Sequence, residues 1–279
     1  MFGILAFGFI VGSWILADIL IAPAPSKVSW PLELAYSPEE IIFPSTDGIN
    51  LKGWFLPQAN STCAVVLLHG VRANRDSMLK RALWLHDLGY NVFLYDARGC
   101  GESDPTKLSF GCYETRDLLG ALRWLQMHGM TKLGCIGSSQ GAATILLASG
   151  QLPSDVHAVV AEASYATLRD TVDDHFRSHT GFPSEYFGVL AVPIAEWKLG
   201  LRRDEVSPLR EISRLKIPLY LIGGTSDVLA PPSGIHELYD AASCEKNLWM
   251  VPWAGHADFF SYDEAEYKQR IGNFLKAHF

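Results

Sequence analysis

The chain has 279 residues, 48% of them hydrophobic, and a formal net charge of −7. This length suits one large domain, and the apolar content is ample for a sizeable core, which excludes a largely disordered protein. The 23 basic residues form no run, so nothing favours a nucleic-acid partner.

The first 24 residues are almost uniformly apolar and carry a single charge, Asp18. About 20 apolar residues can cross a bilayer as a helix, so we predict that residues 1–25 form a transmembrane helix and that residues 1–24 associate the protein with a membrane. A cleaved signal peptide is disfavoured because no basic residue precedes the apolar stretch. An apolar helix docked on the domain, in a cytoplasmic protein, is the remaining alternative. The side of the membrane stays open, since Lys27 is the only nearby cation.

From residue 26 onward, short apolar runs alternate with helical patterns. Two strand-like halves of residues 40–56 flank Thr46-Asp47-Gly48, which is typical of a hairpin turn. Further strands are expected at 64–68, 91–95, 133–136, 158–161, 219–222 and 248–251, and helices at about 76–88, 114–128 and 142–148. This alternation predicts βαβ units, and therefore a mostly parallel sheet with helices on both faces.

The stretch between Tyr165 and Ile217 breaks this rhythm and is rich in aromatic residues. A structureless connection of this length would be unusual inside a compact domain. We therefore predict a small helical cap inserted at about 166–214, within a domain that spans residues 26–279.

The pentapeptide Gly137-Ser138-Ser139-Gln140-Gly141 has the pattern G-x-S-x-G between a predicted strand and a predicted helix. In that context a serine occupies a tight turn that exposes its hydroxyl, and the flanking glycines remove Cβ atoms that would clash. Ser139 is therefore the candidate nucleophile, with Ser138 as its neighbour at the variable position.

A serine hydroxyl needs a base, and the base needs an acid that orients it. His256 follows the last predicted strand, in the segment Trp253–Asp258, and is the candidate base. Asp227 lies in a loop after the strand at 219–222 and is the candidate acid. Glu162 is the reserve acid, whereas Asp258 is too close to His256 in sequence to be the first choice.

Five motifs together resemble the α/β-hydrolase superfamily, in particular bacterial serine esterases and peptidase-like members with a short cap. They are His69-Gly70, Asp96-x-Arg98-Gly99-x-Gly101-x-Ser103, the serine turn, Gly224-x-x-Asp227-x-x-x-Pro231-Pro232 and Gly255-His256. The resemblance covers about residues 40–279 and implies the α/β-hydrolase fold, with a mostly parallel eight-stranded sheet. It also implies an oxyanion hole formed by the backbone N–H groups of Val71 and Gln140.

These features predict a serine hydrolase that cleaves a carboxylic ester of a small-molecule acyl substrate through an acyl-enzyme on Ser139. A thioesterase or a peptidase of the same fold is the alternative, and a non-catalytic binding module is a remote one. No cofactor and no metal are expected. The natural substrate and the oligomeric state stay open.

The five cysteines show no CxxC spacing, which argues against a metal knuckle or a disulfide scaffold. Cys100 and Cys112 fall in one glycine-containing loop region. Reduced thiols are the favoured interpretation, and a bridge between these two residues is the alternative.

Overall fold

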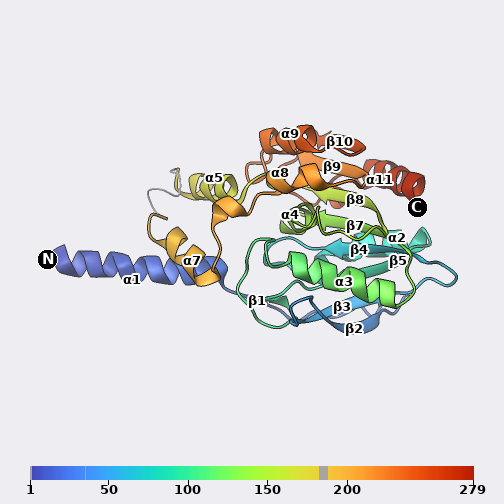
Figure 1. The fold of residues 1–279 in the computed structure, drawn as a ribbon, viewed down its shortest axis with the longest axis horizontal. Helices are drawn as coiled ribbons and strands as arrows, with labels where there is room; N and C mark the ends of the chain where they lie inside the picture. The colour runs from blue at the N-terminus through green and yellow to red at the C-terminus, as the bar shows by residue number, and fades with distance from the viewer. Residues whose placement is uncertain (1, 35, 182–187) are drawn as a thin grey trace.

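A computed structural model describes residues 2–34, 36–181 and 188–279. Its centre is an eight-stranded sheet in the order β10-β9-β8-β7-β4-β5-β3-β2 (Figure 1). The strands are β2 (Glu39–Pro44), β3 (Asn50–Leu56), β4 (Cys63–Leu68), β5 (Asn91–Tyr95), β7 (Lys132–Ser138), β8 (Val156–Glu162), β9 (Leu219–Gly224) and β10 (Lys246–Val251). Only the β2–β3 and β3–β5 pairings are antiparallel, so the predicted mostly parallel eight-stranded sheet is confirmed.

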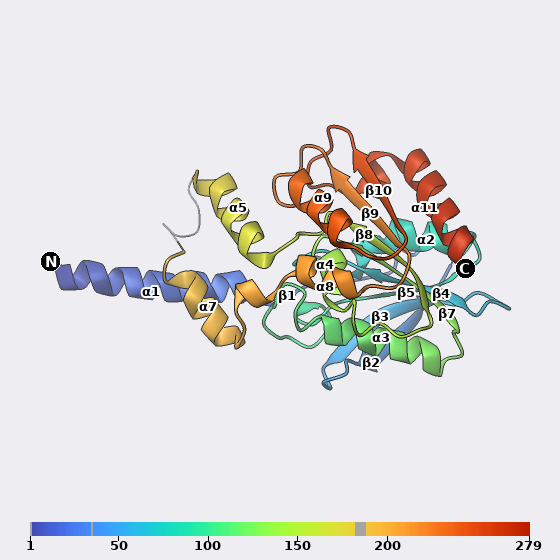
Figure 2. The same cartoon turned by 45° about the horizontal axis from the view of Figure 1, so that its top comes forward.

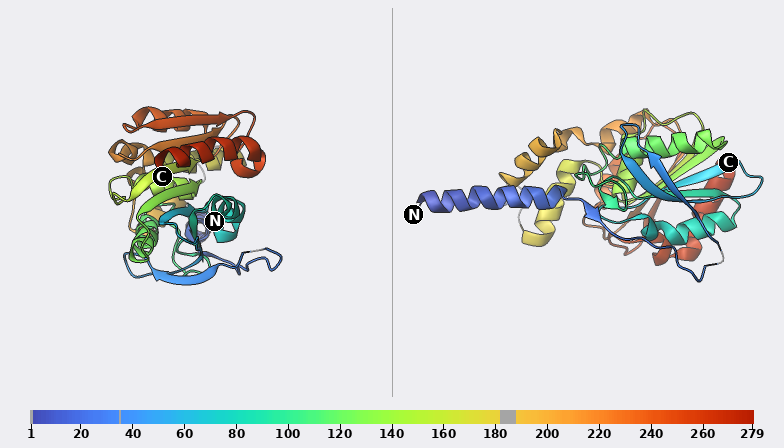
Figure 3. Two further views of the ribbon diagram at one scale, coloured as in Figure 1. Left: turned by 90° about the vertical axis from the view of Figure 1, so that its right-hand side faces the viewer. Right: turned by 90° about the horizontal axis from the view of Figure 1, so that it is seen from below.

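Helices cover both faces of the sheet, as Figure 3 shows in its end-on view. One face carries α3 (Thr115–Met127), α4 (Gln140–Leu147), α8 (Pro208–Glu211), the 3-10 turn η3 (Ile212–Arg214) and α9 (Pro232–Ala241). The other carries the 3-10 turn η1 (Arg75–Met78), α2 (Leu79–Asp87), α10 (Phe259–Tyr262) and α11 (Glu264–His278). Each face has its own cluster of buried apolar side chains, which is the expected layering for strands that are apolar on both sides.

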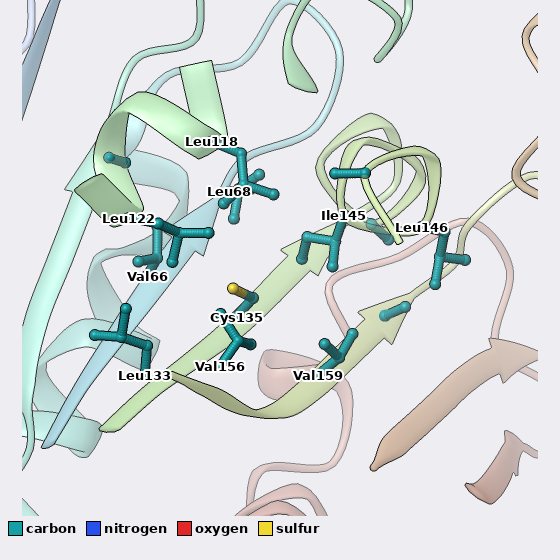
Figure 4. Close-up of a cluster of buried hydrophobic side chains, with 14 of the residues drawn as sticks. Val66, Leu68, Leu118, Leu122, Leu133, Cys135, Ile145, Leu146, Val156 and Val159 are labelled. Atoms are coloured by element: carbon teal, nitrogen blue, oxygen red, sulfur yellow. The ribbon is translucent and has the colours of Figure 1, made fainter. Parts of the chain in front are cut away.

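The core beneath α4 determines where the serine turn lies. Ile145 and Leu146 of α4 pack toward Cys135 of β7 and Val159 of β8, all four of them buried (Figure 4). Because α4 starts one residue after Ser139, this packing anchors the serine turn on the central strands.

The segment between β8 and β9 contains α5 (Leu168–Thr180), α7 (Ala191–Leu199) and the short turn η2 (Arg203–Glu205). In Figure 2, α7 lies against the N-terminal helix and α5 lies apart from it, and all three lie beyond the end of the sheet. The predicted cap residues 182–187 lie outside the described residues. In its described residues, the segment predicted as a cap contains helices.

The N-terminal helix α1 (Phe2–Ile21) projects from the domain, so that the two chain termini lie at opposite ends of the molecule (Figures 1 and 3). Its last turns pack on α7, where Ala17, Ile21 and Ala195 form a small buried cluster. Within the described parts of the chain, no helix has both the length and the apolar character needed to cross a membrane. The predicted transmembrane anchor at 1–25 is therefore wrong, and the predicted membrane association through residues 1–24 is not supported. The end of this helix is packed against the domain, where Asp18 pairs with Lys198.

Candidate active site

Ser139 occupies a strained turn between β7 and α4, with φ 53° and ψ −116°. This backbone conformation is rare for a residue with a side chain and has to be held by its surroundings. A Cβ on Gly137 would lie 2.5 Å from the carbonyl carbon of Gly141, and one on Gly141 would lie 2.4 Å from the carbonyl oxygen of Leu68. Both flanking positions therefore require glycine, for the reason that the sequence pattern suggested.

In the structure, the side chains of Ser139, His256 and Asp227, which were predicted to be catalytic, contact one another in this order. The Nε2 atom of His256 is 3.0 Å from the Oγ atom of Ser139, and its Nδ1 atom is 2.8 Å from Oδ2 of Asp227. The His256 side chain is 28% exposed, whereas that of Asp227 is fully buried. The imidazole can thus reach a substrate while its orienting carboxylate is shielded from water.

The other carboxylate oxygen of Asp227 is held by the backbone. Its Oδ1 atom accepts hydrogen bonds of 2.9 Å from the N–H groups of Leu229 and Ala230. These contacts fix the carboxylate plane, so Oδ2 points at the imidazole without needing a counter-cation.

The two alternative acids are engaged elsewhere. The Glu162 carboxylate is buried and binds the guanidinium of Arg81, with 2.6 Å between Oε2 and Nη2. It also accepts a hydrogen bond of 2.5 Å from the Tyr267 hydroxyl. Asp258 lies 2.6 Å from the same guanidinium. In the described residues, neither carboxylate has a hydrogen bond to His256, whereas Asp227 does.

The predicted oxyanion residues flank the nucleophile. Gln140 starts α4, where the backbone N–H groups of the first turn have no partner within the helix. Val71 follows Gly70, at which an ideal Cβ would lie 3.4 Å from the Cβ of Ser139. The loop therefore passes close to the serine, at a distance where a Cβ on residue 70 would be in ordinary van der Waals contact with it.

His69 holds this loop from the side of the core. Its Nε2 atom accepts a hydrogen bond of 3.0 Å from the Ala97 N–H, so the Nδ1 atom carries the proton and donates to the Gly70 carbonyl oxygen at 2.7 Å. Burial lowers the pKa of His69, which favours this neutral form. Because the C=O and N–H of one planar peptide point in opposite directions, the contact also sets the direction of the Val71 N–H.

A pocket of about 430 Å³ opens beside Ser139 and His256. Its walls are mainly apolar and come from α1, α5, α7 and the loops after β4 and β9. Volumes of this size and an apolar lining with few polar groups are typical of small-molecule sites.

Sequence reasoning missed two contributors to this site. The positioning role of His69 could have been suspected from its place directly after a strand and before Gly70. No sequence pattern in residues 1–25 indicates that α1 contributes to the pocket, because without its contacts the apolar stretch resembles a membrane span. Among the described residues, no group of three His, Cys, Asp or Glu side chains is placed to hold a metal ion.

Cys100 and Cys112 are both free thiols, so the alternative of a bridge between them is not realised. Burial raises the pKa of Cys100 to about 12 and raises that of Cys112 as well. Both thiols are therefore protonated and poorly nucleophilic at neutral pH.

Comparison with known proteins agrees with the fold. A family model described as the alpha/beta hydrolase fold matches residues 64–191. An esterase from Pyrococcus furiosus superposes with a TM-score of 0.78 at 24% identity, over 92% of this chain and 97% of that one. The chain has the α/β-hydrolase fold.

Two bacterial proteins are similar to this chain over most of its length. YqkD of Bacillus subtilis is 29% identical over 241 residues, which span 84% of this chain and 78% of YqkD. YfhR of Escherichia coli K12 is 26% identical over 250 residues, covering 86% of this chain and 81% of YfhR. An acetyl xylan esterase from Paenibacillus has a TM-score of 0.67 at 19% identity, over 97% of this chain and 93% of that one.

Proposed function

We propose that this protein is a serine hydrolase that cleaves carboxylic esters through an acyl-enzyme on Ser139. The observation that carries the proposal is the continuous chain of hydrogen-bond contacts from Ser139 Oγ through His256 to Asp227, at 3.0 and 2.8 Å. A hydroxyl, an imidazole and a buried carboxylate in this order make up the machinery that activates serine for acyl transfer.

In the first half-reaction, Oγ of Ser139 attacks the ester carbonyl carbon while Nε2 of His256 takes the hydroxyl proton. The resulting oxyanion accepts hydrogen bonds from the N–H groups of Val71 and Gln140. Each such donor typically contributes about 3–4 kcal/mol to transition-state stabilisation. The imidazolium is stabilised by Asp227 and returns its proton to the departing alkoxide, which leaves an acyl-serine.

In the second half-reaction, water attacks the acyl-serine while His256 accepts one of its protons. Collapse of the second tetrahedral intermediate expels Ser139 Oγ, which regains its proton from the imidazolium, and the carboxylic acid leaves. The helices α5 and α7 serve as the cap in this proposal, because they wall the pocket above Ser139 and would exclude bulk water.

Two proteins of the same fold, the esterase from Pyrococcus furiosus and the acetyl xylan esterase from Paenibacillus, are consistent with ester hydrolysis. A thioester or a peptide is the alternative substrate, since the same triad serves each of these leaving groups. Matched ester, thioester and anilide substrates with one acyl group would rank them by kcat/KM.

The test of the nucleophile is labelling of the full chain with a fluorophosphonate, followed by peptide mass spectrometry. We expect one adduct on Ser139, its loss in Ser139→Ala, and parallel loss of ester hydrolysis. Ser138→Ala is the matched control, because it removes the neighbouring hydroxyl and should retain labelling. Labelling that survives in Ser139→Ala and disappears in Ser138→Ala would overturn the assignment.

A further inference from the structure

The last turn of α1 forms part of the wall of the active-site pocket. Ile19, Leu20 and Ile21 line the same cavity as Ser139 and His256, although they lie more than a hundred residues away in sequence. Leu20 is half-buried and Ile21 is buried. The helix therefore reaches the reaction centre with its C-terminal end only.

Backbone contacts hold this end in place. The guanidinium of Arg72 donates to the carbonyl oxygens of Ile19 and Leu20, and the Leu108 N–H donates to that of Ile21 at 2.9 Å. The last carbonyl groups of a helix lack partners within it and carry partial negative charge, so a cation there is stabilising.

The chain that follows the helix is also tied down. The short strand β1 (Ala24–Pro25) pairs in parallel with β6 (Cys100–Gly101), and the Ala24 N–H donates to the Gly99 carbonyl oxygen at 2.6 Å. The loop that contains Gly99 thereby fixes where the helix enters the domain.

Side chains of α7 complete the attachment. Lys198 of α7 pairs with Asp18 at 2.6 Å and lies 4.3 Å from the ring centre of Trp14, which also contacts Trp197. The helix α7 lines the pocket with Val192, Ala195 and Leu199. The two helices therefore form one wall, which is mainly apolar and is interrupted by Glu196.

Arg72 connects this wall to the reaction centre. It directly follows Val71 and has a left-handed backbone conformation with φ 57°, which a non-glycine residue adopts only when its surroundings hold it. The residue that binds the end of α1 is therefore the neighbour of the proposed oxyanion donor.

We propose that the C-terminal turn of α1 is a specificity-determining wall of the active-site pocket, and that this wall selects esters with an unbranched apolar chain. The proposal rests on the proposed function of Ser139 and extends it to the class of substrate. Apart from Arg72, Glu196 and Arg203, the side chains along this part of the pocket are almost all apolar, so a chain of methylene groups matches them better than a sugar or a charged group.

The chain length of the substrate tests this directly. Burial of one methylene contributes about 0.8 kcal/mol, which corresponds to roughly a fourfold gain in kcat/KM for each methylene that enters the pocket. We expect kcat/KM of the full-length protein to rise from p-nitrophenyl acetate toward the octanoate. A second series, acetate esters of alcohols of increasing length, shows whether the chain that enters the pocket belongs to the acyl group or to the alcohol.

Variants of α1 then identify the wall. In the ester series that shows the gain, Leu20→Ala should lower the long-chain to short-chain ratio of kcat/KM by at least threefold, and Leu20→Asp by more than tenfold, because a carboxylate would enter an apolar wall. Ile10→Ala and Ile10→Asp are the matched controls: Ile10 is an exposed apolar residue of the same helix that does not line the pocket. They should keep the wild-type ratio.

Binding of 1-octanol by calorimetry separates failure of this inference from failure of the proposed function. If no ester is hydrolysed but octanol binds to the wild-type protein and not to Leu20→Asp, the role of α1 in the pocket is supported and the proposed hydrolase function is wrong. If esters are hydrolysed with no dependence on chain length, or if the Leu20 and Ile10 variants behave alike, the inference is overturned.

Discussion

The backbone N–H of Ser139 donates a hydrogen bond of 2.7 Å to the carbonyl oxygen of Glu162, across the strand ends of β7 and β8. The carboxylate of the same glutamate is buried in its pair with Arg81. The nucleophile turn and a buried ion pair thus share one residue. This arrangement makes Glu162 a support for the position of Ser139, in contrast to the direct contact that Asp227 makes with His256.

Asp227→Asn should reduce kcat by about 10⁴-fold with little loss of stability, because an amide favours the wrong imidazole tautomer. The backbone N–H groups of Leu229 and Ala230 can still bind the amide oxygen, so the loop should keep its shape. Steady-state kinetics with a short ester measure the loss of kcat, and urea unfolding of the same preparation measures stability. A rate within tenfold of wild type would remove Asp227 from the triad.

Glu162→Gln should lower stability strongly and kcat only slightly, the reverse of Asp227→Asn. Breaking a buried ion pair typically costs about 3–5 kcal/mol, and we expect the lower end because Asp258 still pairs with Arg81. Urea unfolding should report this loss, while kcat at a temperature where the variant is folded should fall by less than tenfold. A fully folded Glu162→Gln protein with no turnover would make Glu162, and not Asp227, the functional acid.

Gly141→Ala should destabilise the protein by about 2 kcal/mol and reduce turnover, because the new Cβ would meet the Leu68 and His69 carbonyl oxygens at 2.4 and 2.7 Å. Gly272→Ala in α11 is the matched control. There the nearest atom to the new Cβ, on Trp84, is 3.6 Å away, and alanine in a helix is favoured over glycine by up to about 1 kcal/mol. Thermal unfolding should therefore move in opposite directions for the two variants. Equal shifts would mean that the serine turn is looser than the structure indicates.

His69 predicts a pH dependence of stability. Burial holds its pKa below the ordinary value of 6.5 in the folded protein, while the neighbouring Asp96 and Glu114 offset part of that shift. The unfolded chain therefore binds more protons than the folded one between the lowered pKa and pH 6.5. The contribution of His69 to the free energy of unfolding should be largest above this window and should fall as the pH drops through it.

Urea unfolding at several pH values between about 5 and 8 measures this slope, given the ordinary histidine pKa. His69→Gln should flatten it and His236→Gln should not, because His236 is exposed. Identical slopes for wild type and His69→Gln would show that His69 does not cause the pH dependence.

Much of the fold can be derived from short-range patterns. The alternation of apolar runs and helical faces predicted the order of the strands and helices, since each pattern depends on residues close in sequence. The serine turn was predictable for the same reason: the steric demand at Ser139 is met by glycines within two residues of it. His256 and Asp227 could be chosen because each follows a strand whose end lies at the same edge of a parallel sheet.

The choice between Asp227 and Glu162 depended on the tertiary structure. Glu162 is paired with Arg81, which lies on a helix 81 residues earlier in the chain. The same is true of α1. Its composition resembles that of a membrane span, and only the contacts of its last turn with Arg72, Leu108 and α7 show that it belongs to the pocket. Local patterns specify which elements form, because backbone sterics and periodic burial act over a few residues. The pairing of apolar surfaces depends on residues that are far apart in the chain, and no local pattern specifies these contacts.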